Sequence, residues 1–217
     1  MIKVLSAVAA TGLFALASSQ GMAVERTTIG NVRIVVKTVT GTIESDRRKI
    51  QLLDDIYHNE VIETGDESAT EFVFLDETKM ALGPNSRLVL DRFVYDPEPG
   101  KASFIMTATA GVFRFVSGKL PKMSYEIHTP TATIGIRGTV FSVIVIPGDT
   151  EGNPARVNIT VEDGVADIIS CLGERVSLMR PGESTTVSMN ADGTCAAPTP
   201  PGPQPAEFAR LLAALAL

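Results

Sequence analysis

The sequence predicts an all-β fold of many short strands in a single domain, arranged as a roll, a sandwich or a short solenoid. Three observations lead to this class. Runs of alternating apolar and polar residues fill the chain from Thr28 to Met189. Turn-forming Gly, Pro, Asp and Asn interrupt these runs about every 8 to 12 positions. No long stretch between Val24 and Ala196 keeps the 3.6-residue period of a helix, so we expect one short helix, at the C-terminal end.

Residues 1–23 have the order of features found in a secretory signal peptide. Lys3 precedes an apolar run from Val4 to Ala17, and small residues follow as far as Ala23. We expect cleavage after Ala23, with Ala17 as the second choice. No later stretch reaches the roughly 18 to 20 consecutive apolar residues that a membrane helix needs. The sequence therefore predicts a protein that is exported, to the periplasm or elsewhere, and that is soluble with no membrane span once the leader is removed.

The N-terminal half of the body predicts a series of strands joined by turns. Residues 28–42 suggest two short strands around Gly41, and the charged residues 44–49 suggest a turn. Further on, the expected elements are a hairpin of 69–75 with 79–82, a strand over 87–95, a surface loop at 96–100, and two separate strands at 103–107 and 111–116.

The segment 129–146 predicts two consecutive strands. Pro130 removes a backbone donor and so suits the start of a strand, after which Ala132, Ile134 and Ile136 fall on one face. Residues 143–146 are apolar at every position, which indicates a strand that is buried on both faces.

Two hairpins are expected after this segment. Asp163-Gly164 lies between the alternating runs 157–161 and 165–169, and this dipeptide is a strong short-range hairpin signal. The turn 180–183 is expected to join 176–179 to 184–189 in the same way.

The last 20 residues differ from the body, which we place at residues 24–197. Prolines recur through 198–205 and predict a stiff, extended spacer. Phe208, Leu211, Leu212 and Leu215 then follow a helical period, so residues 198–217 predict a spacer and a short amphipathic helix. Packing of this helix onto the body, or fraying, is favoured over docking onto a partner or a membrane surface.

Charge and residue types exclude several function classes. The formal net charge is −6 and the basic residues are scattered, so nucleic acid is not an expected partner. His58 and His128 are the two histidines of the chain and lie far apart, which makes a catalytic triad or a zinc site hard to assemble. Nucleophile and phosphate-loop motifs are absent. We expect no enzyme activity, no catalytic residue, no metal site and no cofactor.

The two cysteines are expected to form a disulfide. Cys171 and Cys195 are the two cysteines of the sequence, and both lie in the last third of a chain that we expect to be exported. A structural bridge is favoured over a redox role.

Arg137 lies between Gly135 and Gly138 and has two interpretations. Glycines within a strand often mark a bulge or a close backbone approach, which would place Arg137 at a kink. There it would be half-buried and would act as a structural clamp, through a forked ion pair with an acidic residue of a neighbouring strand. The other interpretation is a site for an anionic ligand, with Gly135, Arg137, Gly138 and Thr139 as its candidate binding residues.

The same stretch resembles the hallmark of the FecR domain, a periplasmic module. The residues that carry this resemblance are Thr129-Pro130-Thr131-Ala132 and Ile136-Arg137-Gly138-Thr139-Val140-Phe141-Ser142-Val143, with weaker matches spread over 52–187. The resemblance implies an all-β periplasmic domain that acts in recognition and signal relay, without catalysis. The leader and the proline-rich end differ from the family's sigma-factor regulators, so we expect the chain to lack their cytoplasmic anti-sigma and membrane segments.

These observations lead to a ranked set of functions. The first is a non-enzymatic, exported FecR-type binding or signal-relay module, which engages an envelope protein or glycan through strand edges or the face around Arg137. The alternative is an accessory signalling component of a separately encoded membrane sensor, cyclase or sigma-factor regulator. An envelope hydrolase is the least favoured, since it would rest on scattered carboxylates alone.

Overall fold

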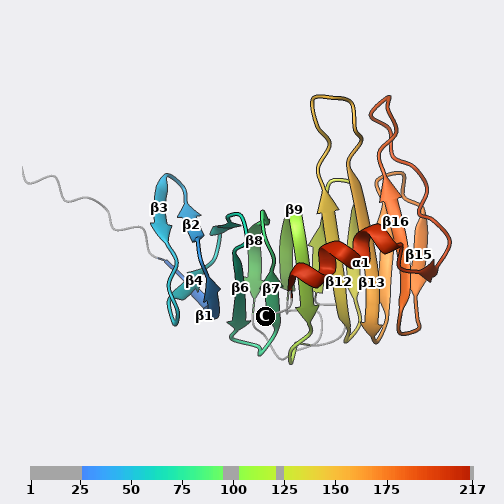
Figure 1. The fold of residues 1–217 in the computed structure, drawn as a ribbon. Helices are drawn as coiled ribbons and strands as arrows, with labels where there is room; N and C mark the ends of the chain where they lie inside the picture. Colours follow the sequence, from blue (N-terminus) through green and yellow to red (C-terminus); the bar gives the residue numbers. More distant parts are fainter. Residues whose placement is uncertain (1–25, 95–102, 121–124, 216–217) are drawn as a thin grey trace, which may run out of the picture.

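The computed structural model describes residues 26–94, 103–120 and 125–215. The expected leader and the expected loop at 96–100 lie outside these residues. Within the described part the protein is a long row of short strands with a single short helix across one face (Figure 1). The all-β class with one C-terminal helix is therefore confirmed.

The strands form two facing sheets, named here the helix-side sheet and the opposite sheet. In spatial order the helix-side sheet contains β4 (Asp55–Tyr57), β1 (Thr28–Val36), β6 (Ala69–Phe74), β7 (Lys79–Leu82), the second half of β9 (Ser103–Val116), β12 (Val140–Ile146), β13 (Arg156–Asp163), β16 (Glu183–Ser188) and β17 (Gly202–Pro203). The opposite sheet contains β3 (Asp46–Lys49), β2 (Val39–Ile43), β5 (Val61–Thr64), β8 (Arg87–Val94), the first half of β9, β10 (Tyr125–His128), β11 (Ala132–Ile136), β14 (Ala166–Ser170) and β15 (Arg175–Leu178).

Strand β9 joins the two sheets and corrects the expectation of two separate strands at 103–107 and 111–116. Its first half pairs with β8 and β10, and its second half pairs with β7 and β12. The change occurs at Gly111, whose φ of 106° bends the strand without a loop. A Cβ at Gly111 would lie 2.1 Å from Ser86 Oγ, so the bend also requires a residue without a side chain.

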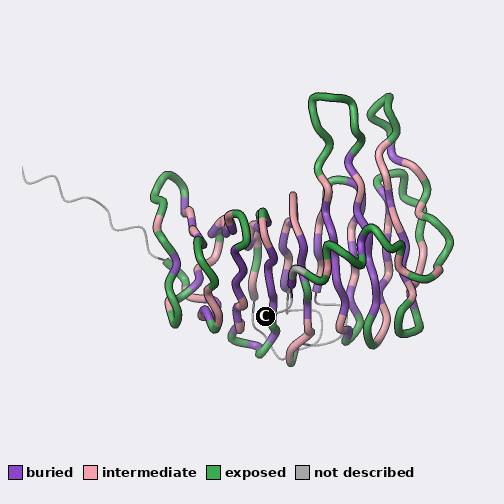
Figure 2. The backbone as a smooth tube through the Cα atoms, in the orientation of Figure 1, coloured by how far each residue is buried: buried purple, intermediate pink, exposed green. Residues whose placement is uncertain are grey.

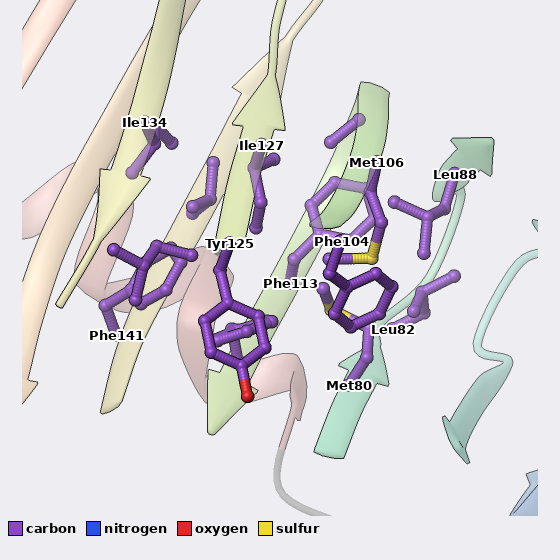
Figure 3. Packing of buried hydrophobic residues seen from close by; sticks show 14 of the residues in the cluster. Met80, Leu82, Leu88, Phe104, Met106, Phe113, Tyr125, Ile127, Ile134 and Phe141 are labelled. Carbon is purple, nitrogen blue, oxygen red and sulfur yellow. The ribbon is translucent and has the colours of Figure 1, made fainter. Parts of the chain in front are cut away.

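The core fills the space between the sheets, as the close-up of the packing shows (Figure 3). Phe104, Met106 and Phe113 of β9 meet Ile134 of β11 and Phe141 of β12 there. Figure 2 shows that buried residues lie along the strands and that exposed residues gather at the loops. In β11 buried and partly exposed residues alternate, which is the period of two that the sequence shows. In β12 the outward residue Ile144 is buried as well, because the C-terminal segment covers it. The expectation that this strand is buried on both faces is therefore correct.

Both hairpins expected after residue 146 are wrong. β13 pairs with β12 and β16, whereas β14 pairs with β11 and β15, so Asp163-Gly164 carries the chain from one sheet to the other. The turn at 180–183 does the same between β15 and β16. A tight turn lets a chain reverse within one sheet or cross to the facing one, and long-range packing decides between these outcomes.

Two expectations near the N-terminal end need correction. Gly41 lies inside β2, and the break between β1 and β2 falls at Lys37, which has a φ of 56°. A Cβ at Gly41 would lie 2.0 Å from Glu60 Oε1, so a side chain there would displace this buried carboxylate. Residues 46–49, expected as part of a turn, form strand β3 and pair with β2.

The C-terminal segment 199–215, named here the strap, crosses the outer face of the helix-side sheet (Figure 1). Thr199 exchanges backbone and side-chain hydrogen bonds with Thr186, and β17 pairs with β16, so the expected spacer is bound to the sheet. Helix α1 (Ala206–Leu212) and the 3₁₀ turn η1 (Ala213–Leu215) follow. Phe208 and Leu215 are buried against Ala81, Val112 and Ile144. The helix therefore packs onto the body.

Candidate functional site

Two crossings between the sheets meet at the hallmark segment. One lies between β11 and β12 at residues 137–139, and the other lies between β13 and β14 at residues 164–165. The Thr139 hydroxyl donates to the Val165 carbonyl at 2.6 Å and accepts from the Val165 N–H at 3.1 Å. The Arg137 N–H also donates to the Val165 carbonyl, at 3.1 Å. These bonds hold the two crossings side by side.

The glycines at this junction are fixed by geometry. Gly138 and Gly164 have φ values of 67° and 84°, in the region that favours glycine. A Cβ on Gly164 would lie 2.2 Å from the Gly138 carbonyl oxygen. Thr139 is buried, and its backbone N–H donates to Ser117 Oγ at 2.9 Å. Gly138 and Thr139 therefore hold the fold together at this point.

A groove of about 230 Å³ lies next to this junction, on the outer face of the opposite sheet. The residues that line it are Tyr125, Glu126, Thr133, Gly135, Ile136, Arg137, Asp167, Ile169 and Arg175, from β10, β11, β14 and β15 and the residue after β11. The strand register places Glu126, Gly135 and Asp167 in one row across the sheet. Since Gly135 has no side chain, the row is hollow between the two carboxylates, and this hollow forms the groove.

The charges on the groove are only partly paired. Arg137 Nη2 lies 2.7 Å from Asp167 Oδ2, and Ser177 Oγ also donates to Asp167. His128 Nε2 lies 2.7 Å from Glu126 Oε1 at the other side of the row. Arg175 is exposed and has no ion-pair partner among the residues that the structure describes. A cation at the rim is thus available to a ligand.

Arg137 follows β11 directly and forms an ion pair with Asp167 of the neighbouring strand β14. The structural-clamp interpretation predicts such a contact, and the role of Arg137 stays a prediction. The pair uses Nη2 without the expected fork, and the side chain is 45% exposed. Its guanidinium is therefore accessible from the groove.

Among the described residues, forked ion pairs occur at two other places. Arg48 uses Nε and Nη2 on the two carboxylate oxygens of the fully buried Glu60, at 2.9 and 3.2 Å. Arg114 and Glu162 form a second fork on the outer face of the helix-side sheet, with contacts of 2.8 to 3.1 Å. Hydrogen bonding from Arg114 lowers the pKa of Glu162, and the same bonds raise the pKa of Arg114.

A buried polar cluster supports one end of the groove. The Tyr125 hydroxyl donates to Asp76 Oδ2 at 2.7 Å and accepts from the Leu120 N–H at 3.1 Å. Thr78 also donates its hydroxyl to Asp76, at 2.6 Å. Burial raises the pKa of Tyr125 to about 12, so this side chain stays neutral and continues to donate at ordinary pH. The cluster fixes β10 relative to the β6–β7 turn.

The structure brings two of the four candidate binding residues to the groove. Gly135 and Arg137 line it, whereas Gly138 and Thr139 lie in the crossing beside it. Sequence reasoning missed Glu126, Asp167 and Arg175, since their meeting depends on the register of four strands. The available signal was that Gly135 of β11 and Arg137, which follows this strand, fall on the same outward side by the period of two.

Other expected features have clear positions. Cys171 and Cys195 lie at disulfide distance, with Cα atoms 5.8 Å apart, and link the β14–β15 turn to the segment after β16. Among the described residues, no group of three His, Cys, Asp or Glu is placed to hold a metal ion. Within the same part of the chain, no helix is long and apolar enough to cross a membrane.

The fold and the groove define an all-β scaffold of two facing sheets that presents a charged hollow on one outer face. Residues 60–167 match the family model described as FecR protein, which covers the strands from β5 to the start of β14, at Asp167. The chain belongs to the FecR family, so the resemblance seen in the sequence is confirmed. Membership of this family supports a role in signalling or regulation.

Two crystal structures, at 1.65 and 2.50 Å resolution, are similar to this chain over part of its length. Both are of a protein from Parabacteroides distasonis described as a candidate anti-sigma factor. Each is 15% identical to this chain with a TM-score of 0.48, and the match covers 69% of this chain and 62% of the other. The chain thus spans less than two thirds of the length of these structures. No curated protein matches the sequence.

Proposed function

We propose that this protein is a non-enzymatic, exported FecR-type module that binds an envelope protein or glycan and relays a signal, and that the groove at Gly135 is its binding face. The observation that carries the proposal is the hollow between Glu126 and Asp167, which Gly135 leaves open beside two accessible cations, Arg137 and Arg175. Concave sites with a few placed polar groups are the usual location of ligand binding.

Gly135 also makes the proposal testable without damage to the fold. A Cβ built on Gly135 has the Asp167 carbonyl oxygen at 3.8 Å as its nearest contact, which is an ordinary van der Waals distance. Gly135 lies within a regular strand, where glycine is disfavoured and a side chain should be tolerated. Gly135→Gln should therefore fill the hollow and leave the sheet intact.

The experiment is capture of partners from a native envelope extract by chemical cross-linking. Wild type would be compared with Gly135→Gln and with Thr42→Gln, which adds the same group on β2, at the far end of the same sheet. We expect one envelope component to be enriched by wild type and Thr42→Gln and lost with Gly135→Gln. Equal capture of this component by all three proteins would show that the groove is not the binding face. If wild type enriched no component over an unrelated exported protein, the binding function itself would be contradicted.

A further inference from the structure

Strand β15 is the outermost strand of the opposite sheet, and its outer side is open. Across the described residues it pairs with β14 alone. The Ser170 N–H donates to the Glu174 carbonyl at 2.8 Å, so the hydrogen-bonded positions on this strand are Glu174, Val176 and Leu178. In the alternation of an antiparallel pair, the N–H and C=O groups of Arg175 and Ser177 must then point away from β14. They form an unused row of donors and acceptors.

The other sheet edges are protected in ways that β15 is not. The edge strand β3 consists of Asp46, Arg47, Arg48 and Lys49, and charged side chains discourage pairing. The edge strand β17 contains Pro203, which has no N–H to donate. The edge strand β4 is only three residues long. β15 carries a single charge, Arg175, and lies between two exposed apolar side chains, Leu172 at 56% and Met179 at 66%.

We propose that β15 pairs antiparallel with β15 of a second copy of this chain, with Val176 at the two-fold axis. Only Arg175 and Ser177 have outward backbone groups, so they alone can form the new hydrogen bonds. A register that placed Arg175 opposite Arg175 of the partner subunit would set like charges against each other. The register with Arg175 opposite Ser177 of the partner subunit avoids this repulsion.

This register makes the edge self-complementary. Arg175 comes beside the partner's Ser177, whose hydroxyl donates to an aspartate, Asp167, of its own copy. The guanidinium of Arg175 therefore approaches a carboxylate of the other copy. Gly173 comes opposite the partner's Met179, which brings the exposed Leu172 to the partner's exposed apolar side chain. Val176, which packs on the edge of the core, meets the partner's Val176 and is covered.

The pairing would also change the groove. Arg175 lines the groove and lies at the open edge, so the two copies place their grooves on one continuous sheet surface. The partner's Arg175 then lies at the rim of each groove, next to Ser177. The dimer does not depend on which ligand the groove takes, and it can be tested without one.

Proline and alanine at Ser177 give a matched pair of variants. Ser177→Pro removes the outward N–H and the hydroxyl, whereas Ser177→Ala removes the hydroxyl alone and keeps the N–H. The mass of the oxidised mature chain would be measured by light scattering or sedimentation equilibrium over a range of concentrations. We expect a wild-type dimer, and a dissociation constant at least about tenfold higher for Ser177→Pro than for Ser177→Ala, because symmetry removes two hydrogen bonds at once. A wild-type monomer at every concentration, or equal dimerisation of the two variants, would overturn the proposal.

Cysteine cross-linking tests the register even if the proline variant does not fold. Val176 faces its own copy across the axis in a non-hydrogen-bonded pair, where Cα atoms are about 4.5 Å apart and a disulfide can form. Val176→Cys should give a covalent dimer on mild oxidation. Ser177→Cys, whose side chain faces the partner's Arg175, should give little. Cross-linking of Ser177→Cys at the same rate as Val176→Cys would overturn the register, and no cross-linking of either would overturn the dimer.

Discussion

The Thr139 hydroxyl forms hydrogen bonds with both the N–H and the carbonyl of Val165, the two groups that a neighbouring strand would otherwise pair with. It donates to the carbonyl at 2.6 Å and accepts from the N–H at 3.1 Å. Since Thr139 and Val165 lie on crossings that run between the two sheets, the side chain replaces strand pairing at a place where no strand can continue. This explains in physical terms why a threonine follows the glycine of the hallmark.

Replacement of Thr139 by valine should destabilise the fold by about 1–3 kcal/mol, because the Val165 N–H loses its partner and the Val165 carbonyl keeps only the Arg137 N–H. Thr139→Ser keeps the hydroxyl and should lose less. The measurement is urea unfolding of the oxidised protein followed by circular dichroism. Equal losses for the two variants would mean that the methyl group matters more than the hydrogen bonds.

Gly164→Ala should be among the most damaging single-methyl changes in the chain. The new Cβ would lie 2.2 Å from the Gly138 carbonyl oxygen, and the residue has a φ of 84°. Gly173→Ala is a matched control, since its φ is 86° and nothing lies within 4 Å of the place that its methyl group would occupy. We expect a loss of about 1 kcal/mol for Gly173→Ala, from backbone strain, and about 3 kcal/mol or more for Gly164→Ala. Similar unfolding midpoints for the two variants would contradict the close approach at the crossing.

Most strand positions could be predicted from the sequence, with β3 and the continuous β9 as exceptions, and the assignment of strands to sheets could not. The alternation of Ala132, Ile134 and Ile136 gives β11 and its buried face directly. Asp163-Gly164 gives a turn, but the same dipeptide serves a hairpin or a crossing. The choice depends on contacts such as that between Thr139 and Val165, which are 26 residues apart in the chain.

The groove was predictable to a similar extent. The glycines around Arg137 mark a special backbone position, and the parity of β11 places Gly135 and Arg137 on the outer face. Arg175 joins them only because β14 lies between β11 and β15 in a fixed register. A local pattern carries no information about such a register, so the rim of the groove could not be predicted from it.

The fork between Arg114 and Glu162 should make stability depend on pH. Arg114 lowers the pKa of Glu162 in the folded state below the ordinary value of 4.5, so the unfolded state takes up a proton first as the pH falls. The contribution is therefore complete above about pH 4.5 and is lost as the pH falls through the lowered pKa. Both side chains are partly exposed, which limits the contribution to about 1 kcal/mol or less.

Comparison of wild type with Arg114→Gln by urea unfolding at several pH values checks this. The difference in unfolding free energy should be present at pH 7 and should shrink as the pH falls below 4.5. A similar substitution at Arg33, which has no ion pair among the described residues, should show no such trend. A difference for Arg114→Gln that stays constant across this range would mean that packing of the arginine stem, and not its charge, stabilises the sheet.

The strap should be released by a single change at Phe208. This side chain belongs to α1, is 1% exposed and packs against the outer face of the helix-side sheet. The guanidinium of Arg156 lies over its ring and also forms an ion pair with Glu207, at 3.1 Å. Loss of a buried phenylalanine costs about 3–5 kcal/mol. A helix of seven residues is not stable by itself in water, so α1 cannot stay folded without this packing. Phe208→Ala should therefore lower the hydrogen-exchange protection of residues 199–215 by about a hundredfold or more, and leave the β12 amides protected. Leu211→Ala, at a position that is 42% exposed, is the control and should change little. If β12 lost protection together with the strap, the strap would be part of the cooperative core and not a separately opening cover on it.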